Sequence, residues 1–244
     1  MSAGRTVLVT GGSRGIGKAI ALRLAREGAA RVAIGYFRSD AAAEETADEL
    51  RALGAEPVLV RGNVTSSRVA EQVEALGSID VLVHNAATGV IRPALETEDK
   101  HWDWTLNANS RALLSLTRIA APAMSRGSSI VAISSLGSVR VLENYTLVGV
   151  SKAALEALVR YLAVELAPRG IRVNAVSAGV VETGALEHFP NREEMLASGA
   201  ANPAGQLVTP EDIAGVVSFL ASVDAEMIRG QVVVIDGGWS LPAG

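Results

Sequence analysis

The sequence predicts a Rossmann-type α/β fold, in which one doubly wound parallel sheet of about seven strands carries helices on both faces. Short runs rich in β-branched residues alternate with longer amphipathic runs, and no long linker, repeat or low-complexity stretch interrupts them. The short runs are almost entirely apolar, as expected for strands that helices cover on both faces. A chain of 244 residues that is 49% hydrophobic can bury one large core, so we predict a single domain over residues 1–244.

The expected elements follow from this alternation. Strands are predicted at Thr6–Thr10, Arg31–Gly35, Pro57–Arg61, Val81–Asn85, Ser129–Ser134, Arg172–Val176 and Val232–Ile235. Helices are predicted at Gly15–Glu27, Ala41–Leu53, Arg68–Leu76, Trp102–Ser125, Lys152–Leu166 and Pro210–Ala221. The stretch 182–205 fits the pattern poorly, because it is long and mixed in character, and we predict that it forms a substrate lid.

Composition narrows the class of protein. The formal net charge is −4 with both signs scattered, which disfavours nucleic acid and anionic membranes as partners. The absence of cysteine excludes disulfides and thiolate catalysis, and the three histidines share no metal-ligand spacing, so no metal site is expected. The first strand begins at Thr6, which leaves no room for a signal peptide, and no apolar run reaches membrane-spanning length. We therefore expect a cytoplasmic protein.

A glycine-rich turn follows the first strand, in the run Thr10–Gly17. Gly11, Gly15 and Gly17 permit a tight turn, a close backbone approach to a pyrophosphate, and close packing of helix on strand. The helix that begins there offers free N–H groups to phosphates. Many strand–helix turns use glycine for structural reasons alone, but in this position the pattern favours a dinucleotide site.

The end of the second strand bears on the choice of dinucleotide. NAD sites usually place a carboxylate there for the ribose 2′-hydroxyl, whereas this chain has no acid before Asp40. Arg14 and Arg38 could both face a 2′-phosphate, for which guanidinium geometry is favourable. The alternative is two solvated surface arginines. Their joint placement favours NADP(H).

Tyr145 and Lys152 form the most informative pair in the chain. On an α-helix a separation of seven residues is about two turns, so both side chains would emerge on nearly the same face. A phenol and an ammonium placed in this way suit the binding of a cofactor and the stabilisation of charge on a substrate oxygen. One turn closer to the lysine, the chain carries Val148.

These motifs resemble the short-chain dehydrogenase/reductases over essentially the whole chain. The glycine turn, Asn109, Ser135, Lys152 and the segments His84–Ala87 and Ser177–Gly179 stand in the family's order and approximate spacing. The Tyr-x6-Lys spacing resembles the enoyl-acyl-carrier-protein reductases. The segment Ser134–Glu165, with His101–Trp104, is particularly similar to the NADPH-dependent type III form. Val148 occupies the usual tyrosine position, and His84 and Asn63 also depart from the family's common residues.

The resemblance implies roles for individual residues. Lys152 would bind the nicotinamide ribose and help to polarise the hydroxyl of Tyr145, because an adjacent cation favours a more acidic phenol. Ser135 would lie beside the substrate or nicotinamide, and Asn109 would shape the neighbouring helix and hold a water. Ser135 and Asn109 could instead be ordinary hydrogen-bonding residues, and Tyr145 could be a core aromatic. The predicted cofactor-binding residues are Gly11, Ser13, Arg14, Gly15, Ile16, Gly17, Arg38, Ser39, Asn63, Val64, Asn85, Ala86, Ala87, Lys152, Gly179 and Thr183.

The position of the tyrosine favours one reaction. A ketoreductase needs its acid at the oxygen bonded to the carbon that accepts hydride, whereas an enoyl thioester accepts hydride at C3 and develops charge farther away, on the thioester oxygen. Moving the tyrosine back by three residues shifts its origin by ~4.5 Å along a helix. We therefore predict an NADPH-dependent enoyl reductase acting on a thioester, on acyl carrier protein. Alternatives are an enoyl-coenzyme A reductase, a 3-oxoacyl-thioester or other carbonyl reductase, and a cofactor-binding regulatory protein without turnover.

Two further predictions concern the acyl chain and assembly. Leu186, Phe189, Met195 and Leu196 could line an acyl pocket with Tyr145, although buried loop packing explains them equally well. The helices around Trp102–Ser125 and Tyr145–Leu166 carry long apolar faces, which related reductases pair across subunits. We therefore expect a homotetramer, or at least a homodimer.

Overall fold

Seven parallel strands form a single sheet in the order β3-β2-β1-β4-β5-β6-β7. A computed structural model describes residues 4–184, 186 and 191–241 of the chain. The strands are β1 (Arg5–Thr10), β2 (Ala29–Tyr36), β3 (Glu56–Arg61), β4 (Val81–His84), β5 (Ser129–Ser135), β6 (Arg172–Ala178) and β7 (Val232–Ile235). The order reverses between β1 and β4, which is the point where open α/β sheets bind their ligands.

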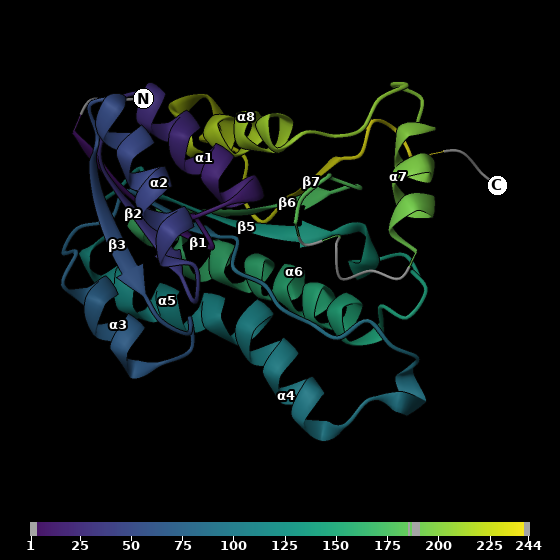
Figure 1. Ribbon diagram of the computed structural model, residues 1–244. Helices are drawn as coiled ribbons and strands as arrows, with labels where there is room; N and C mark the ends of the chain where they lie inside the picture. The colour runs from purple at the N-terminus through teal and green to yellow at the C-terminus, as the bar shows by residue number, and fades with distance from the viewer. Residues whose placement is uncertain (1–3, 185, 187–190, 242–244) are drawn as a thin grey trace.

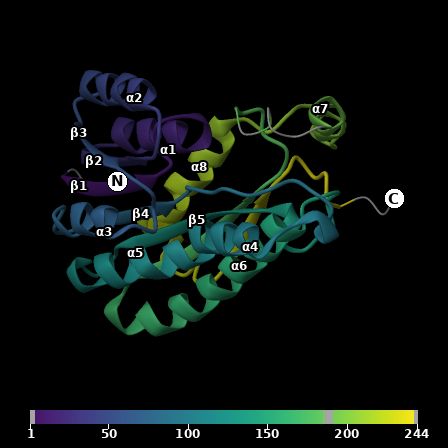
Figure 2. The same cartoon turned by 60° about the horizontal axis from the view of Figure 1, so that its bottom comes forward.

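Helices cover both faces of the sheet (Figures 1 and 2). One layer holds α1 (Gly15–Arg26), α2 (Asp40–Ala52) and α8 (Pro210–Ala221). The other layer holds α3 (Ser67–Glu74), α4 (Asp99–Leu106), α5 (Ala112–Ala120) and α6 (Thr146–Leu166). Two apolar clusters fill the spaces between the sheet and these layers, and alternate residues of β1 point into each: Val7 and Val9 into one, Leu8 into the other.

The predicted fold class is confirmed, and each predicted strand lies within two residues of its observed bounds. The central strands were accessible to prediction because most of their residues are buried, whereas the edge strands β3 and β7 are mostly half-buried or exposed. β6, for example, is buried along its whole length, so its apolar run has no alternation that a helix could imitate.

Two helix predictions were wrong in their bounds. The expected helix Trp102–Ser125 is divided: α4 ends at Leu106, a π-helical stretch covers Asn107–Arg111, and α5 ends at Ala120. The helix expected from Lys152 begins six residues earlier, at Thr146, and in this added stretch Leu147, Val148, Gly149 and Ser151 are buried. Single-turn π segments inside helices are frequent at functional sites, which directs attention to Asn109.

Within the described residues of the stretch predicted as a lid, Arg192–Ala200 form the helix α7. Figures 1 and 2 show α7 outside the two helical layers, at one end of the molecule. Whether it closes over a substrate stays a prediction. Within the described residues, no helix has both the length and the apolar character needed to cross a bilayer.

Candidate active site

The glycine-rich turn after β1 packs too closely for side chains. A Cβ at Gly17 would lie 2.0 Å from the carbonyl oxygen of Gly11, and Gly11 itself has φ = 67°. Gly15 also adopts a positive φ, of 53°. These residues need glycine because their backbones touch or adopt left-handed conformations. The result is a bare backbone cradle in front of the N-terminus of α1, where no side chain caps the free N–H groups.

Residues from two other strands hold this turn. The side-chain amide of Asn85, after β4, donates to the carbonyl oxygens of Thr10 at 3.1 Å and Gly11 at 3.0 Å. Thr183, after β6, lies close to Gly15, at 3.4 Å from the position that a Cβ there would occupy. The structure thus brings together the predicted cofactor residues of the glycine turn, Asn85 and Thr183.

Two exposed arginines follow the first two strands: Arg14 in the glycine turn after β1, and Arg38 after β2. Arg14 precedes α1, and the Arg38 guanidinium stacks over the ring of Phe37 at 5.1 Å. Asp40, the first acid of this region, pairs with Arg61 at 3.0 Å. Ser39 caps α2, and Asn63 caps the turn after β3 by accepting from Thr65. The donor set of cradle, helix terminus and guanidinium groups fits a phosphorylated dinucleotide.

Tyr145 lies immediately before α6 and not within it. Its carbonyl oxygen accepts the helical N–H of Gly149 at 2.7 Å, while Asn144 before it adopts φ = 57°. Tyr145 is thus the N-cap residue of α6, and the turn at Asn144 precedes it. Whether its side chain shares a helical face with Lys152 stays a prediction. Its hydroxyl donates to Ser135 Oγ at 3.3 Å.

Glycine 137 shapes the space for this phenol. A Cβ at Gly137 would lie 2.5 Å from Cε1 of Tyr145, so the ring packs directly on the backbone that follows β5. A Cβ at Gly149 would meet the carbonyl oxygen of Gly137 at 2.7 Å. Reasoning from the sequence missed both glycines, and only their contact with each other across the fold reveals the role.

Lys152 is buried on α6 and donates to the carbonyl oxygen of Ile133 at 2.7 Å. Burial lowers the pKa of Lys152 to about 8, and the nearby Glu156 carboxylate opposes this lowering. Burial also raises the pKa of Tyr145, which the hydrogen bond to Ser135 opposes. This direction differs from the expected acidic phenol, because the effect of burial outweighs that of the hydrogen bond.

Asn109 sits in the π-helical stretch and connects three elements. Its side chain accepts from the N–H of Thr88 at 2.8 Å and donates to the carbonyl oxygen of Thr88 at 2.9 Å. The same amide donates to Ser151 Oγ at 2.8 Å, next to Lys152 in α6. Asn109 is fully buried, so these bonds fix the loop after β4 against α6.

The structure shows a role for His84 that the sequence alone did not indicate. Its Nε2 lies 3.0 Å from the carbonyl oxygen of Asn109, and its Nδ1 lies 3.3 Å from Oγ1 of Thr10. Because a carbonyl can only accept, Nε2 carries the proton and Nδ1 accepts from Thr10. Burial, reinforced by the charge of Lys152, lowers the pKa of His84 to about 4. A neutral imidazole therefore joins the glycine turn to the π-helical stretch.

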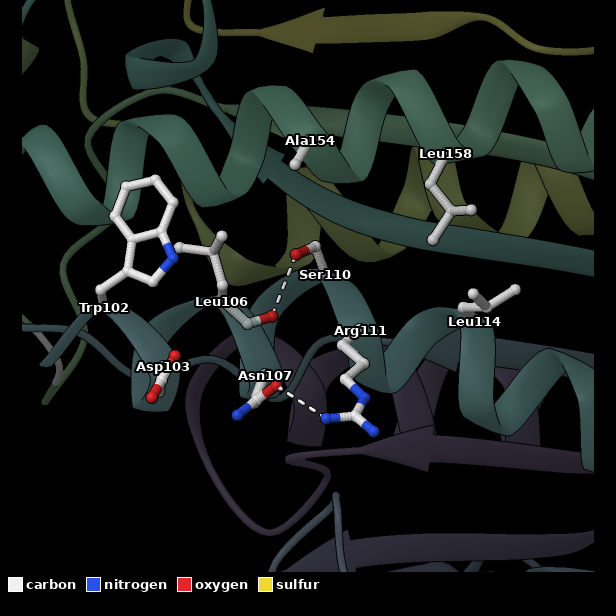
Figure 3. A pocket seen from close by; sticks show the side chains of 9 residues that line it. All are labelled: Trp102, Asp103, Leu106, Asn107, Ser110, Arg111, Leu114, Ala154 and Leu158. Carbon is white, nitrogen blue, oxygen red and sulfur yellow. Dashed lines mark hydrogen bonds between the residues drawn. The ribbon is translucent and has the colours of Figure 1, made fainter. Parts of the chain in front are cut away.

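The residues predicted to line an acyl pocket are only partly buried and only partly described. Leu186 is buried, Met195 and Leu196 are half-buried on α7, and Phe189 lies outside the described residues. A separate hollow of ≈ 390 Å³ is lined by residues of α4, the π-helical stretch, α5 and α6. Trp102, Leu114 and Leu158 present apolar side chains there (Figure 3). None of the predicted catalytic residues lines this hollow.

Comparison with known proteins identifies the family. A family model described as enoyl-(acyl carrier protein) reductase matches residues 11–240. The 1-cyclohexenylcarbonyl-CoA reductase of Streptomyces collinus is 36% identical, over 97% of this chain and 87% of that protein. The hydroxynaphthalene reductase-like protein Arp2 of Metarhizium brunneum is 35% identical, over 97% and 95% of the two chains. The structure of a blue fluorescent protein from a metagenomic library, in complex with NADPH, has a TM-score of 0.89 at 33% identity, covering 98% of each chain.

Fold and site together define a Rossmann-type oxidoreductase. The chain belongs to the short-chain dehydrogenase/reductase superfamily, in agreement with the resemblance read from its motifs.

Proposed function

We propose that the protein reduces trans-2-enoyl thioesters with NADPH. The observation that carries this proposal is the placement of Tyr145, whose hydroxyl bonds Ser135 while the position one turn into α6 holds Val148. Val148 is buried and packs so closely on Gly89 that a Cβ on that glycine would lie 2.2 Å from its Cγ2. The site therefore has its phenol at the start of α6 and an apolar wall where a ketoreductase-type acid would stand.

The chain's own residues account for the chemistry as follows. Bound NADPH supplies a hydride from its nicotinamide ring. An enoyl thioester that gains hydride at C3 develops negative charge on its thioester oxygen, which needs a hydrogen-bond donor in a dry environment. The hydroxyl of Tyr145, which donates to Ser135 Oγ in this structure, would turn its single proton to that oxygen, and Ser135 Oγ would then donate to the phenol oxygen. The proton that C2 gains as the enolate collapses would come from solvent. The raised pKa of Tyr145 keeps it protonated at neutral pH, as a donor must be.

NADP(H) is the proposed cofactor because of the charges in the glycine turn and at the carboxyl end of β2. Arg14 and Arg38 are exposed and free of any recorded ion pair among the described residues, and Asp40 is paired with Arg61. A 2′-phosphate would therefore meet guanidinium groups and no unpaired carboxylate there. The metagenomic relative with NADPH bound has the same fold over 98% of its length.

The carrier of the acyl group is proposed from chemistry and relatives. The name of the Streptomyces collinus protein describes a double bond beside a thioester carbonyl, and the matched family model is named for the carrier-protein thioester. We favour acyl carrier protein over coenzyme A. A carbonyl reductase is the second candidate, since the Metarhizium relatives carry the name hydroxynaphthalene reductase-like.

A substrate panel tests the proposal. NADPH oxidation is followed with crotonyl and longer enoyl thioesters on both carriers, beside acetoacetyl thioesters. We expect turnover of the enoyl thioesters and little or none of the acetoacetyl ones. Faster reduction of the acetoacetyl thioesters would replace the proposal with the carbonyl reductase.

Two substitutions test the assigned residues. Tyr145→Phe should lower kcat by about 10²–10³, the usual loss for a positioned oxyanion donor, while NADPH affinity stays close to wild type. Lys152→Ala should weaken NADPH binding as well as turnover, because its ammonium is assigned to the nicotinamide ribose. Tyr161→Phe is the matched control, since Tyr161 lies on the same helix and is 69% exposed. Near wild-type reduction by Tyr145→Phe would show that the tyrosine only packs.

A further inference from the structure

A second buried charge lies one turn beyond Lys152 on α6. Glu156 is only 6% exposed, and its Oε1 accepts a hydrogen bond from Ser134 Oγ at 2.5 Å. Side chains four residues apart on a helix face the same way, with their Cβ atoms about 5–6 Å apart. Ser134 follows Ile133, the residue whose carbonyl oxygen accepts from Lys152. The two charges thus lie side by side beneath the same stretch of β5.

The surroundings of Lys152 leave few groups that can influence its charge. On β4, His84 is neutral at physiological pH, because its pKa is lowered to about 4. From β5 come the carbonyl oxygen of Ile133 and the hydroxyl of Ser134, neither of which titrates. The phenol of Tyr145, ahead of α6, has a raised pKa and stays neutral in the same range. Glu156 is left as the negative charge that favours the ammonium.

A structural joint between β5 and α6 would not need this charge. A glutamine could accept the same bond from Ser134, and burying a carboxylate costs more than burying an amide. What the carboxylate adds is an attraction to the neighbouring ammonium, which burial otherwise drives towards the neutral amine.

We propose that Glu156 is a positioning residue that keeps Lys152 charged inside the protein, so that Lys152 can bind the nicotinamide ribose at neutral and mildly alkaline pH. Ser134 holds the carboxylate in place for this purpose. The inference rests on the proposed function only in the role given to Lys152.

The experiment measures NADPH affinity by fluorescence from about pH 6.5 to about pH 9.5, with unfolding followed at each pH by circular dichroism. Wild-type affinity should fall through a midpoint that reports Lys152, near its pKa of about 8. In Glu156→Gln the midpoint should move down by about one pH unit, the size expected for removal of a nearby opposite charge. At the acid end of the range the two proteins should bind NADPH within about twofold of each other, since Lys152 is charged in both.

Two other variants separate the effect of the Glu156 charge from that of its hydrogen bond to Ser134. Glu156→Asp keeps the charge on a shorter side chain, and its midpoint should fall between those of the wild type and Glu156→Gln. Ser134→Ala removes the hydrogen bond but leaves the charge, so it should move the midpoint less than Glu156→Gln does. A midpoint in Glu156→Gln equal to the wild-type midpoint, with only the unfolding temperature lowered, would overturn the proposal. If Glu156→Gln does not fold, Glu156→Asp decides by the same criterion.

Lys152→Ala distinguishes a failure of the role given to Lys152 from a failure of the role given to Glu156. Loss of the alkaline midpoint in this variant shows that the midpoint belongs to Lys152, and the Glu156 variants can then be judged. Unchanged NADPH affinity and an unchanged midpoint in Lys152→Ala would refute the role of Lys152, and with it this inference. The midpoint shift in Glu156→Gln is measured without substrate, so it stands or falls separately from the enoyl specificity.

Discussion

Mild acid is expected to destabilise the protein through His84. In the folded protein the pKa of His84 is lowered to about 4, first by burial and then by the charge of Lys152, from an ordinary value of 6.5. The unfolded chain therefore takes up a proton between these two values, and the folded chain does not. Since the unfolded state binds more protons there, stability falls as the pH falls from about 6.5 and levels off near pH 4.

The magnitude follows from the two pKa values. The difference is 6.5 − 4 = 2.5, and at ~1.36 kcal/mol for each pKa unit the full loss is ~3 kcal/mol. Because His84 is fully buried, no discount for solvent screening applies. By pH 5 the loss should already be about 2 kcal/mol. The pKa values of Glu27 and Asp236 are also lowered in the folded protein, so these groups too make stability fall as the pH falls. Their ordinary values are 4.5 and 3.8, so most of their effect lies below this window.

Urea unfolding followed by tryptophan fluorescence measures the effect at fixed protein concentration, so that any assembly contributes equally at each pH. His84→Gln is the test variant. It should be less stable than wild type at neutral pH, because the bridge between Thr10 and the carbonyl oxygen of Asn109 is broken. Between about pH 6.5 and about pH 5 its stability should change little. A wild-type protein with no acid loss in this window, or a variant with the same loss, would refute the assignment of a neutral buried imidazole.

Two further outcomes are expected. Arg38→Asp should weaken NADPH binding much more than NADH binding, because it replaces a phosphate partner by a repelling charge, and equal losses for both cofactors in a titration would remove the 2′-phosphate role. The protein should be a homotetramer, or at least a homodimer, through the faces of α4, α5 and α6, where Trp102, Trp104 and Leu114 are 44%, 49% and 38% exposed. Light scattering should then show that Leu114→Glu, in the hollow of Figure 3, shifts the protein to smaller species, whereas a wild-type monomer at every concentration would contradict the interface.

The sequence predicted those parts of the molecule that local pattern determines. The central strands β4 and β6 are buried along their whole length, so their apolar runs are visible without any partner. The glycine turn is also local, because the glycines that need small side chains or positive φ lie within seven residues of each other along the chain. NADP(H) follows from the same kind of local information, because Arg38 stands where an acid would select NAD and Arg14 lies in the glycine turn.

Residues whose roles depend on distant partners could not be assigned in this way. His84 meets Thr10 and Asn109 across 74 and 25 residues of chain, and Ser134 meets Glu156 across 22. The π-helical stretch at Asn109 is hidden in the sequence for the same reason. Its residues have no special helix propensity, and its extra residue is stabilised by bonds from the Asn109 side chain to Thr88 and to Ser151.

The placement of Tyr145 depends both on a local sequence pattern and on contacts with residues distant in the chain. The Tyr-x6-Lys spacing led to a helix through both residues and to a displacement of about 4.5 Å along one face. The helix instead begins at Thr146, and the phenol is aimed by the turn at Asn144 and by the bare backbone of Gly137 beneath its ring. The direction of the displacement survives, because Val148 still occupies the apolar position against Gly89. Its distance, however, is decided by a loop and by a contact between β5 and the start of α6, so the chemistry read from the spacing depends on residues that the spacing does not contain.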